Sequence, residues 1–177
     1  MKFISFNHDN SEKFGIIENN LITDLTGKID GALSLKELIK IKKIKEAKEY
    51  AKSNPGSIKL DQIKYSPLIP NPGKIICVGL NYSEHVKETN RTVEENPVIF
   101  HRFPESQTAH MQAIQRPTVS ESLDFEGEMA VIMGEGGKHI KPEDALKHIV
   151  GFSCYNESTI REWQRHTRQF GMGKNFE

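Results

Sequence analysis

The sequence has few cysteines, no long apolar run and no excess of either charge. Among 177 residues there are 2 cysteines, Cys77 and Cys154, too few for a disulfide framework, and we expect both to be free thiols buried in strands of a cytoplasmic protein. Lys plus Arg and Asp plus Glu both number 24, so no net field favours nucleic acid or a lipid surface. The first residues are charged, which argues against a signal peptide or a membrane span. A small-molecule partner is expected.

Composition divides the chain into two regions. Residues 1–65 predict a small N-terminal α+β domain, the proline-rich stretch 66–73 predicts a linker, and residues 74–177 are rich in strand-like apolar runs. Within the first region, Asn19 and Asn20 separate two apolar runs. Asparagine tolerates the positive φ angles of a tight turn, so this pair predicts a β-hairpin.

One helical stretch and several strands can be placed along the chain. Ser34 and Glu37 have the spacing of a capping box, so a helix is expected to begin there and to end near Asn54. Apolar runs in the second region predict buried strands over residues 74–79, 97–100, 125–133 and 149–156. The fold class is therefore expected to be α+β and mainly β, with short helices as connections.

Three carboxylates occur at alternate positions of one apolar run: Asp124, Glu126 and Glu128. In an extended strand, side chains two residues apart point to the same face, with Cα atoms roughly 6.6 Å apart. Two like charges side by side in a buried strand need positive charge between them, and the following residues 129–133 are apolar enough to predict burial. The pattern favours a divalent metal ion held by oxygen ligands.

Two further groups carry chemistry. His85 and Glu88 are three residues apart, so on one helical turn the carboxylate can orient the imidazole as a general base, although this spacing alone is more often a surface pair. Gly171 and Gly173 precede Lys174, which is typical of a turn that brings an ammonium group to an anionic ligand. An ordinary glycine-rich loop is the alternative interpretation.

The motifs resemble one known family when taken in order. KIICVGLNYSEHVKE, PVIFHRFPES, LDFEGEMAVIMG, HIVGFSCYNESTIREWQ and GKNFE follow one another over residues 74–177 as in the fumarylacetoacetate hydrolase family. The resemblance implies a rolled, mixed β-sheet catalytic domain, preceded by a smaller domain, that works as a homodimer and binds Mg²⁺, Mn²⁺ or Ca²⁺. It also implies that the catalytic domain continues beyond residue 177.

The resemblance assigns the metal ligands and the group that activates water. Glu126 and Glu128 correspond to the first two ligands, and Glu157 stands where the family usually has the Asp of an Asn-Asp pair. The extra methylene of Glu157 shifts its carboxylate relative to that Asp. His85 and Glu88 correspond to the water-activating pair.

The resemblance also assigns contacts with the substrate. Lys174 corresponds to the lysine that faces the substrate oxygens, with roles in binding and catalysis. Tyr82 belongs to the first motif and is a further candidate contact. Arg102 stands where many relatives have Lys, and its guanidinium favours bidentate contact with a carboxylate.

The function implied is a metal-dependent hydrolase or lyase. It would cleave a C–C bond of an acylpyruvate or related 2-oxo or dicarbonyl acid through a metal-stabilised enolate. Two alternatives stay open: an isomerase or decarboxylase of a hydroxymuconate-like or oxaloacetate-like acid, and an inactive fragment that only binds metal. A zinc site that joins the His85 pair to His101 and His110 is a third, weaker alternative.

Overall fold

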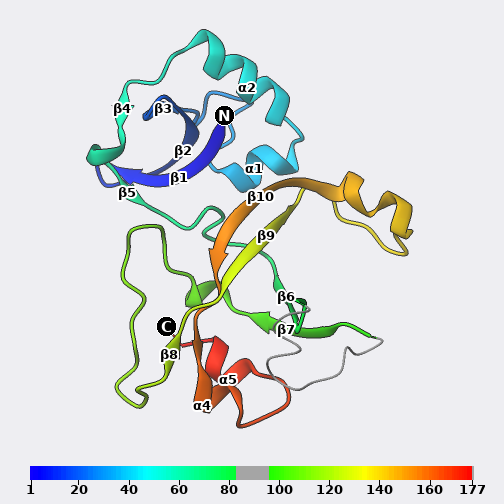
Figure 1. The fold of residues 1–177 in the computed structure, drawn as a ribbon. Coiled ribbons are helices and arrows are strands. Elements are labelled where there is room, and N and C mark those ends of the chain that lie inside the picture. Colours follow the sequence, from blue (N-terminus) through cyan, green and yellow to red (C-terminus); the bar gives the residue numbers. More distant parts are fainter. Residues whose placement is uncertain (83–95, 177) are drawn as a thin grey trace. The chain divides into compact units, whose positions relative to one another are not determined.

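The computed structural model describes residues 1–82 and 96–176, which fall into two compact units. Unit 1 comprises Met1–Pro70, Thr108–Ala113 and Gly127–Tyr155, and unit 2 comprises Asn71–Gln107, Ile114–Glu126 and Asn156–Glu177. The chain as a whole is mainly β with short helices, as the sequence predicted (Figure 1). The predicted division at 1–65, 66–73 and 74–177 stays a prediction.

Unit 1 is built on a five-stranded antiparallel sheet with the order β4-β3-β2-β1-β5. Its strands are β1 (Lys2–His8), β2 (Ser11–Glu18), β3 (Leu21–Asp24), β4 (Ile58–Lys59) and β5 (Lys64–Tyr65), with the short 3₁₀ helix η1 (Leu60–Gln62) before β5. Asn19 and Asn20 link β2 to β3 with φ angles of 51° and 63°. The predicted hairpin is therefore confirmed, and these positive φ values explain the two asparagines.

The predicted helical stretch is two helices, α1 (Leu35–Lys40) and α2 (Ile44–Ser53). The Ser34 hydroxyl caps α1 by accepting the Glu37 N–H at 3.2 Å, and the Glu37 carboxylate accepts the N–H of Leu33 at 2.7 Å. The expectation of one uninterrupted helix was wrong because Lys42 adopts a φ of 60° between the two. Asn54 follows the last helical residue, as predicted.

Alternation along the strands of unit 1 creates two apolar layers. Phe14 and Ile16 of β2 pack with α1 and α2, for example against Leu38. Ile4 and Phe6 of β1 belong to a second cluster. Side chains of successive strand residues point to opposite faces, so the sheet has a core on each side.

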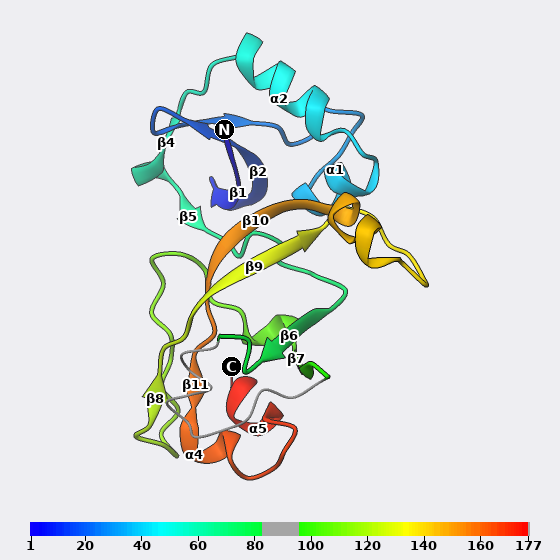
Figure 2. The same cartoon turned by 45° about the vertical axis from the view of Figure 1, so that its right-hand side comes forward.

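The long hairpin of unit 1 pairs β9 (Gly127–Met133) with β10 (Ile149–Asn156) and carries the 3₁₀ helix η3 (Pro142–His148) at its connection (Figure 2). The predicted strand over 149–156 is confirmed, but its expected burial was wrong, because none of the residues of β10 is buried. The prediction that residues 129–133 make β9 a buried strand was wrong. Buried positions do not occur in β9, and Met129 is 62% exposed. Apolar sequence alone cannot distinguish a strand covered on both faces from one with an open face.

Unit 2 contains two short antiparallel ladders and short helices. Its elements are β6 (Ile75–Gly79) paired with β7 (Val98–Arg102), β8 (Leu123–Asp124) paired with β11 (Thr159–Ile160), η2 (Pro104–Ser106), α4 (Arg161–Gln164) and α5 (Gly171–Lys174). The prediction that β6 is buried was also wrong, because Ile76 is 55% exposed while its neighbours are only partly covered. The expected rolled, mixed sheet stays a prediction, since these ladders are antiparallel.

Both cysteines are free, as predicted, but their expected burial was wrong: Cys77 is partly exposed and Cys154 is exposed. Each lies in a strand with an open face, β6 or β10, so the apolar run around it does not enclose the thiol. Over residues 1–82 and 96–176, the helices are too short or too polar to cross a membrane.

Asp24 at the end of β3 provides a test of the sheet by its pH dependence. Burial alone would raise its pKa, but the Lys13 ammonium at 2.9 Å and the Thr26 N–H at 2.9 Å lower the pKa below its usual value. A lowered folded-state pKa adds stability at neutral pH, and this stability is lost as the pH falls through that value. We expect Asp24→Asn to cost about 1 kcal/mol of unfolding free energy at pH 7. The difference from wild type should shrink below about pH 4 in urea titrations.

Asp61→Asn is the matched control, because Asp61 is an exposed carboxylate of the same unit. A constant Asp24→Asn deficit from pH 7 to pH 3 would contradict the ion-pair origin of this stability.

Candidate metal centre

The three predicted metal ligands lie together. Glu126, Glu128 and Glu157 each offer a carboxylate oxygen, and these oxygens lie within 4.8 Å of one another. Glu126 is not in a strand as expected, but in the break between β8 and β9. Two hydrogen bonds fix it there: its N–H donates to the Asn156 side-chain oxygen at 3.0 Å, and its C=O accepts the Glu157 N–H at 2.8 Å.

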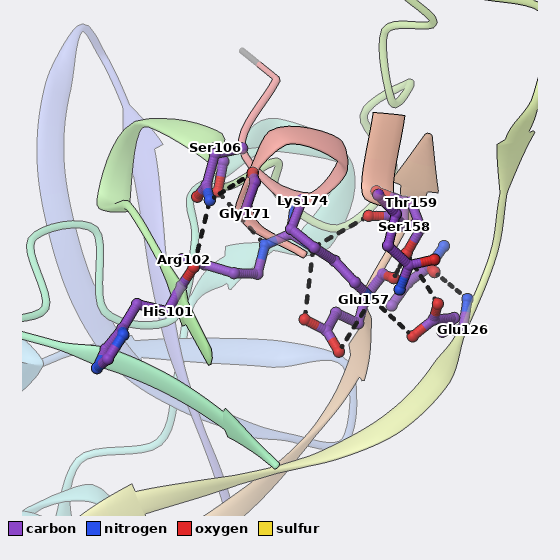
Figure 3. Close-up of polar contacts among 12 residues, drawn as sticks. His101, Arg102, Ser106, Glu126, Glu157, Ser158, Thr159, Gly171 and Lys174 are labelled. Carbon is purple, nitrogen blue, oxygen red and sulfur yellow. Dashed lines mark hydrogen bonds and ion pairs between the residues drawn. The ribbon is translucent and has the colours of Figure 1, made fainter. Parts of the chain in front are cut away.

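Glu157 is the buried member of the group, only 6% exposed (Figure 3). Its Oε2 lies 3.4 Å from the Lys174 Nζ, and its Oε1 lies 3.7 Å from Nη1 of Arg102. Over the described part of the chain, Oε1 of Glu157 accepts no hydrogen bond. A buried carboxylate oxygen without a hydrogen-bond donor is costly, and a bound cation is one way to satisfy it.

Lys174 is brought into the site by the tight packing of α5. The helix follows Phe170, whose φ is 62°, and a Cβ at Gly173 would lie 2.3 Å from the Gln164 backbone nitrogen. Glycine is therefore needed for α5 to pack this closely. Lys174 is 2% exposed, and its Nζ donates to Glu126 Oε2 at 2.9 Å. The predicted glycine turn before the lysine thus has a packing function.

The other predicted contacts are distributed differently. Arg102, at the end of β7, is buried, and its guanidinium donates to the Ser158 C=O at 3.0 Å and to the Ser106 hydroxyl at 3.5 Å. Tyr82 is largely exposed. His85 and Glu88 lie outside the described residues. The assigned roles of all four in binding and catalysis stay predictions.

Sequence reasoning missed two residues that hold the Glu126 side chain, Arg161 and Thr159. Arg161 brings its Nη1 to 2.6 Å from Glu126 Oε1, and its Nε and Nη2 both lie 2.8 Å from Asp124 Oδ2. The Thr159 hydroxyl, fully buried, donates to Glu126 Oε1 at 2.8 Å. The ladder between β8 and β11 pairs Thr159 with Asp124 and so assembles the group. The alternating carboxylates from Asp124 to Glu128 marked Asp124 as a candidate site residue. Nothing in the sequence indicated the ladder between β8 and β11.

These charges set the protonation states of the site. Burial would raise the pKa of Glu126, but Lys174, Thr159 and Arg161 together lower it below the usual range. The hydrogen bond from Arg161 lowers the pKa of Asp124. Desolvation, and then the charge of Glu157, raise the pKa of Cys77 to about 12, so this thiol stays neutral and is a poor nucleophile.

The donor set fits a hard divalent cation. It consists of carboxylate oxygens only, which suits Mg²⁺, Mn²⁺ or Ca²⁺ rather than zinc. Within residues 1–82 and 96–176, the glutamate triad is the single group of acidic, His or Cys side chains with this geometry. His101 and His110 do not belong to it, so the described residues give the zinc alternative no support.

Comparison with known proteins gives the class and then the family. Residues 74–177, more than half of the chain, match the family model "Fumarylacetoacetate (FAA) hydrolase C-terminal". The glutamate triad lies within this span, and the chain is similar to enzymes that are named as hydrolases and tautomerases. The chain therefore belongs to the fumarylacetoacetate hydrolase family, as the resemblance implied.

Two of the relatives are named as oxaloacetate tautomerases. The chain is 39% identical over 117 residues to the mitochondrial oxaloacetate tautomerase Fahd2a of Rattus norvegicus, which covers 66% of this chain and 37% of the relative. It is 36% identical over 136 residues to the mitochondrial oxaloacetate tautomerase fahd2 of Xenopus laevis, covering 76% and 43%. The chain thus spans about two-fifths of the length of these relatives.

Solved structures match along nearly the whole chain. A fumarylacetoacetate hydrolase from Exiguobacterium antarcticum has a TM-score of 0.76 at 29% identity, covering 100% of this chain and 62% of that one. A maleylpyruvate hydrolase from Sphingobium sp. SYK-6, solved with manganese(II) and pyruvate, has a TM-score of 0.76 at 19% identity, covering 98% and 63%. At that identity, the second match establishes the fold alone.

Lys174 should stabilise the metal-free protein. Removing its ammonium leaves the buried Glu157 and the partly buried Glu126 with less compensating charge, so we expect Lys174→Met to lower the unfolding free energy by about 3 kcal/mol in the presence of a chelator. Denaturant titration at pH 7 measures this loss. Lys74→Met removes an exposed lysine of the same unit and should leave the midpoint unchanged. A Lys174→Met midpoint equal to that of wild type would argue against a structural ion pair.

Proposed function

We propose that the chain carries the metal site of an enzyme that forms the enolate of a 2-oxo acid. The observation behind this proposal is the buried Glu157 oxygen without a hydrogen-bond donor, close to Glu126 and Glu128. Mg²⁺ or Mn²⁺ is the expected ion, with Ca²⁺ as a further candidate. Such an ion acts as a Lewis acid that withdraws charge from the 2-oxo group of a bound substrate.

An anionic substrate suits the cations of the site. Arg102 and Lys174 line one small hollow together with Ser158 and Thr159. Their charges favour a carboxylate and would stabilise negative charge on an adjacent oxygen. The two relatives from Rattus norvegicus and Xenopus laevis are named as oxaloacetate tautomerases. We therefore propose a small 2-oxo acid, with an oxaloacetate-like dicarboxylate as first choice.

Keto–enol tautomerisation is the reaction we favour. It requires a proton to move between carbon and oxygen of the substrate, and no bond between heavy atoms breaks. We assign to Lys174 the role of stabilising the charge that develops on oxygen; the support for this role is that its Nζ lies beside two of the proposed metal ligands, 2.9 Å from Glu126 Oε2 and 3.4 Å from Glu157 Oε2. The two relatives that are named as oxaloacetate tautomerases support tautomerisation over decarboxylation.

C–C hydrolysis of an acylpyruvate is the second candidate. It is favoured by the His85 and Glu88 spacing, because hydrolysis requires an activated water molecule. An inactive metal-binding fragment is the third, because the chain spans only part of its relatives. A cytoplasmic homodimer remains part of the proposal.

A substrate panel separates these candidates. We expect the chain with Mg²⁺ or Mn²⁺ to accelerate the loss of enol absorbance from oxaloacetate without release of pyruvate. Release of pyruvate with CO₂ from oxaloacetate would indicate decarboxylation, and release of pyruvate from an acylpyruvate would indicate hydrolysis. Tight metal binding with no turnover on the whole panel would favour the inactive fragment.

Glu157→Gln tests the link between the metal site and activity. Loss of this carboxylate should weaken Mn²⁺ binding at least about tenfold, equivalent to ~1.4 kcal/mol, and lower turnover with it. Glu162→Gln changes an exposed carboxylate five positions away and should alter neither. Mn²⁺ affinity of Glu157→Gln equal to that of wild type would overturn the proposed site.

A further inference from the structure

Arg161 forms an ion pair with Glu126, one of the proposed metal ligands. Its Nη1 lies 2.6 Å from Glu126 Oε1, the shortest ion pair of this cluster, and the rest of the guanidinium contacts Asp124. Gln164 accepts a further hydrogen bond from Nη1 at 3.1 Å. The guanidinium is thus fixed from three sides with its charge directed at the carboxylate that a cation would need.

The carboxylates of the cluster differ in how well they are satisfied. Glu126 Oε1 accepts a hydrogen bond from Thr159 and forms an ion pair with Arg161, and Glu126 Oε2 accepts a hydrogen bond from Lys174. Oε1 of buried Glu157, in contrast, accepts no hydrogen bond within the described part of the chain. On Glu157 a divalent ion can therefore bind an oxygen that lacks a hydrogen bond and lies 3.7 Å from Arg102 Nη1, whereas on Glu126 it must exchange with a cation at 2.6 Å.

Arg161 is the cation that can leave Glu126. Lys174 is 2% exposed and lies between two carboxylates, so it has little room to move. The Arg161 side chain is 24% exposed, and Asp124 can keep its Nε and Nη2 when Nη1 leaves Glu126. The guanidinium therefore keeps most of its hydrogen bonds when a divalent ion replaces it at Glu126.

We propose that Arg161 is an internal counter-ion that competes with the divalent ion for Glu126 and so sets the ion affinity of the site. This inference rests on the proposed metal site. It makes Arg161 a positioning residue, because it acts through Glu126. Asp124 is the anchor that retains the guanidinium in the ion-bound state.

Mn²⁺ binding, measured by the electron paramagnetic resonance signal of free Mn²⁺, tests the competition. Arg161→Gln should bind Mn²⁺ about tenfold more tightly than wild type, equivalent to ~1.4 kcal/mol. Arg161→Lys keeps the charge but cannot reach both carboxylates with several donors, so we expect a smaller gain. Arg165→Gln removes an exposed charge four residues later and should change the affinity less than about twofold.

The outcomes separate the two proposals. If neither wild type nor Arg161→Gln binds Mn²⁺, both the metal site and the competition are wrong. If wild type binds Mn²⁺ and both Arg161 variants bind it equally or more weakly, the competition is overturned while the metal site stands. If Arg165→Gln increases the Mn²⁺ affinity as much as Arg161→Gln does, the competition is also overturned. Loss of any nearby positive charge would then explain the increase.

A measurement on wild type does not depend on how the variants fold. The Arg161 Nη–H resonances, assigned by their absence in Arg161→Lys, should shift during a Mg²⁺ titration with the same midpoint as ion binding, because Nη1 is the atom that leaves Glu126. A resonance that stays unchanged at saturating Mg²⁺ would overturn the exchange.

Discussion

Compensation of buried negative charge is the constraint on which this site depends. The Glu157 N–H donates to the Glu126 C=O at 2.8 Å, and this hydrogen bond holds the two residues side by side in the backbone. Two such charges in a poorly solvated place destabilise the fold unless cations lie beside them. The Lys174 ammonium contacts Glu126 and lies near Glu157, and this explains why α5 packs so closely that position 173 has to be glycine.

The same constraint explains the arrangement of unit 2. The two-residue ladder between β8 and β11 contributes little packing, but it places Thr159 beside Asp124. The chain then turns directly into α4, so that Arg161 reaches both Asp124 and Glu126. A short irregular region can therefore hold several charges at fixed distances because each carboxylate restrains a cation from a neighbouring element.

Local signals in the sequence predicted local structure well. The positive φ of Asn19 and Asn20 and the cap at Ser34 depend on residues close in the chain, and each was predicted. The proximity of Glu126 to Glu157 followed from the family resemblance, not from spacing. Arg161 as a partner of Glu126 could not be predicted, because that contact depends on the register between two short strands far apart in the chain.

The prediction that the strands β6 and β9 are buried was wrong for a different physical reason. The residues of β6 and β9 are apolar on successive positions, which is typical of strands covered on both faces. In this chain one face of each strand is open, with Ile76 and Met129 exposed. The apolar residues of a strand show which side chains can be buried. The elements that pack against the strand determine which of them are buried. The grouping of the carboxylates does not require β9 to be buried, because Glu157 and Lys174, which both lie in unit 2, are themselves buried.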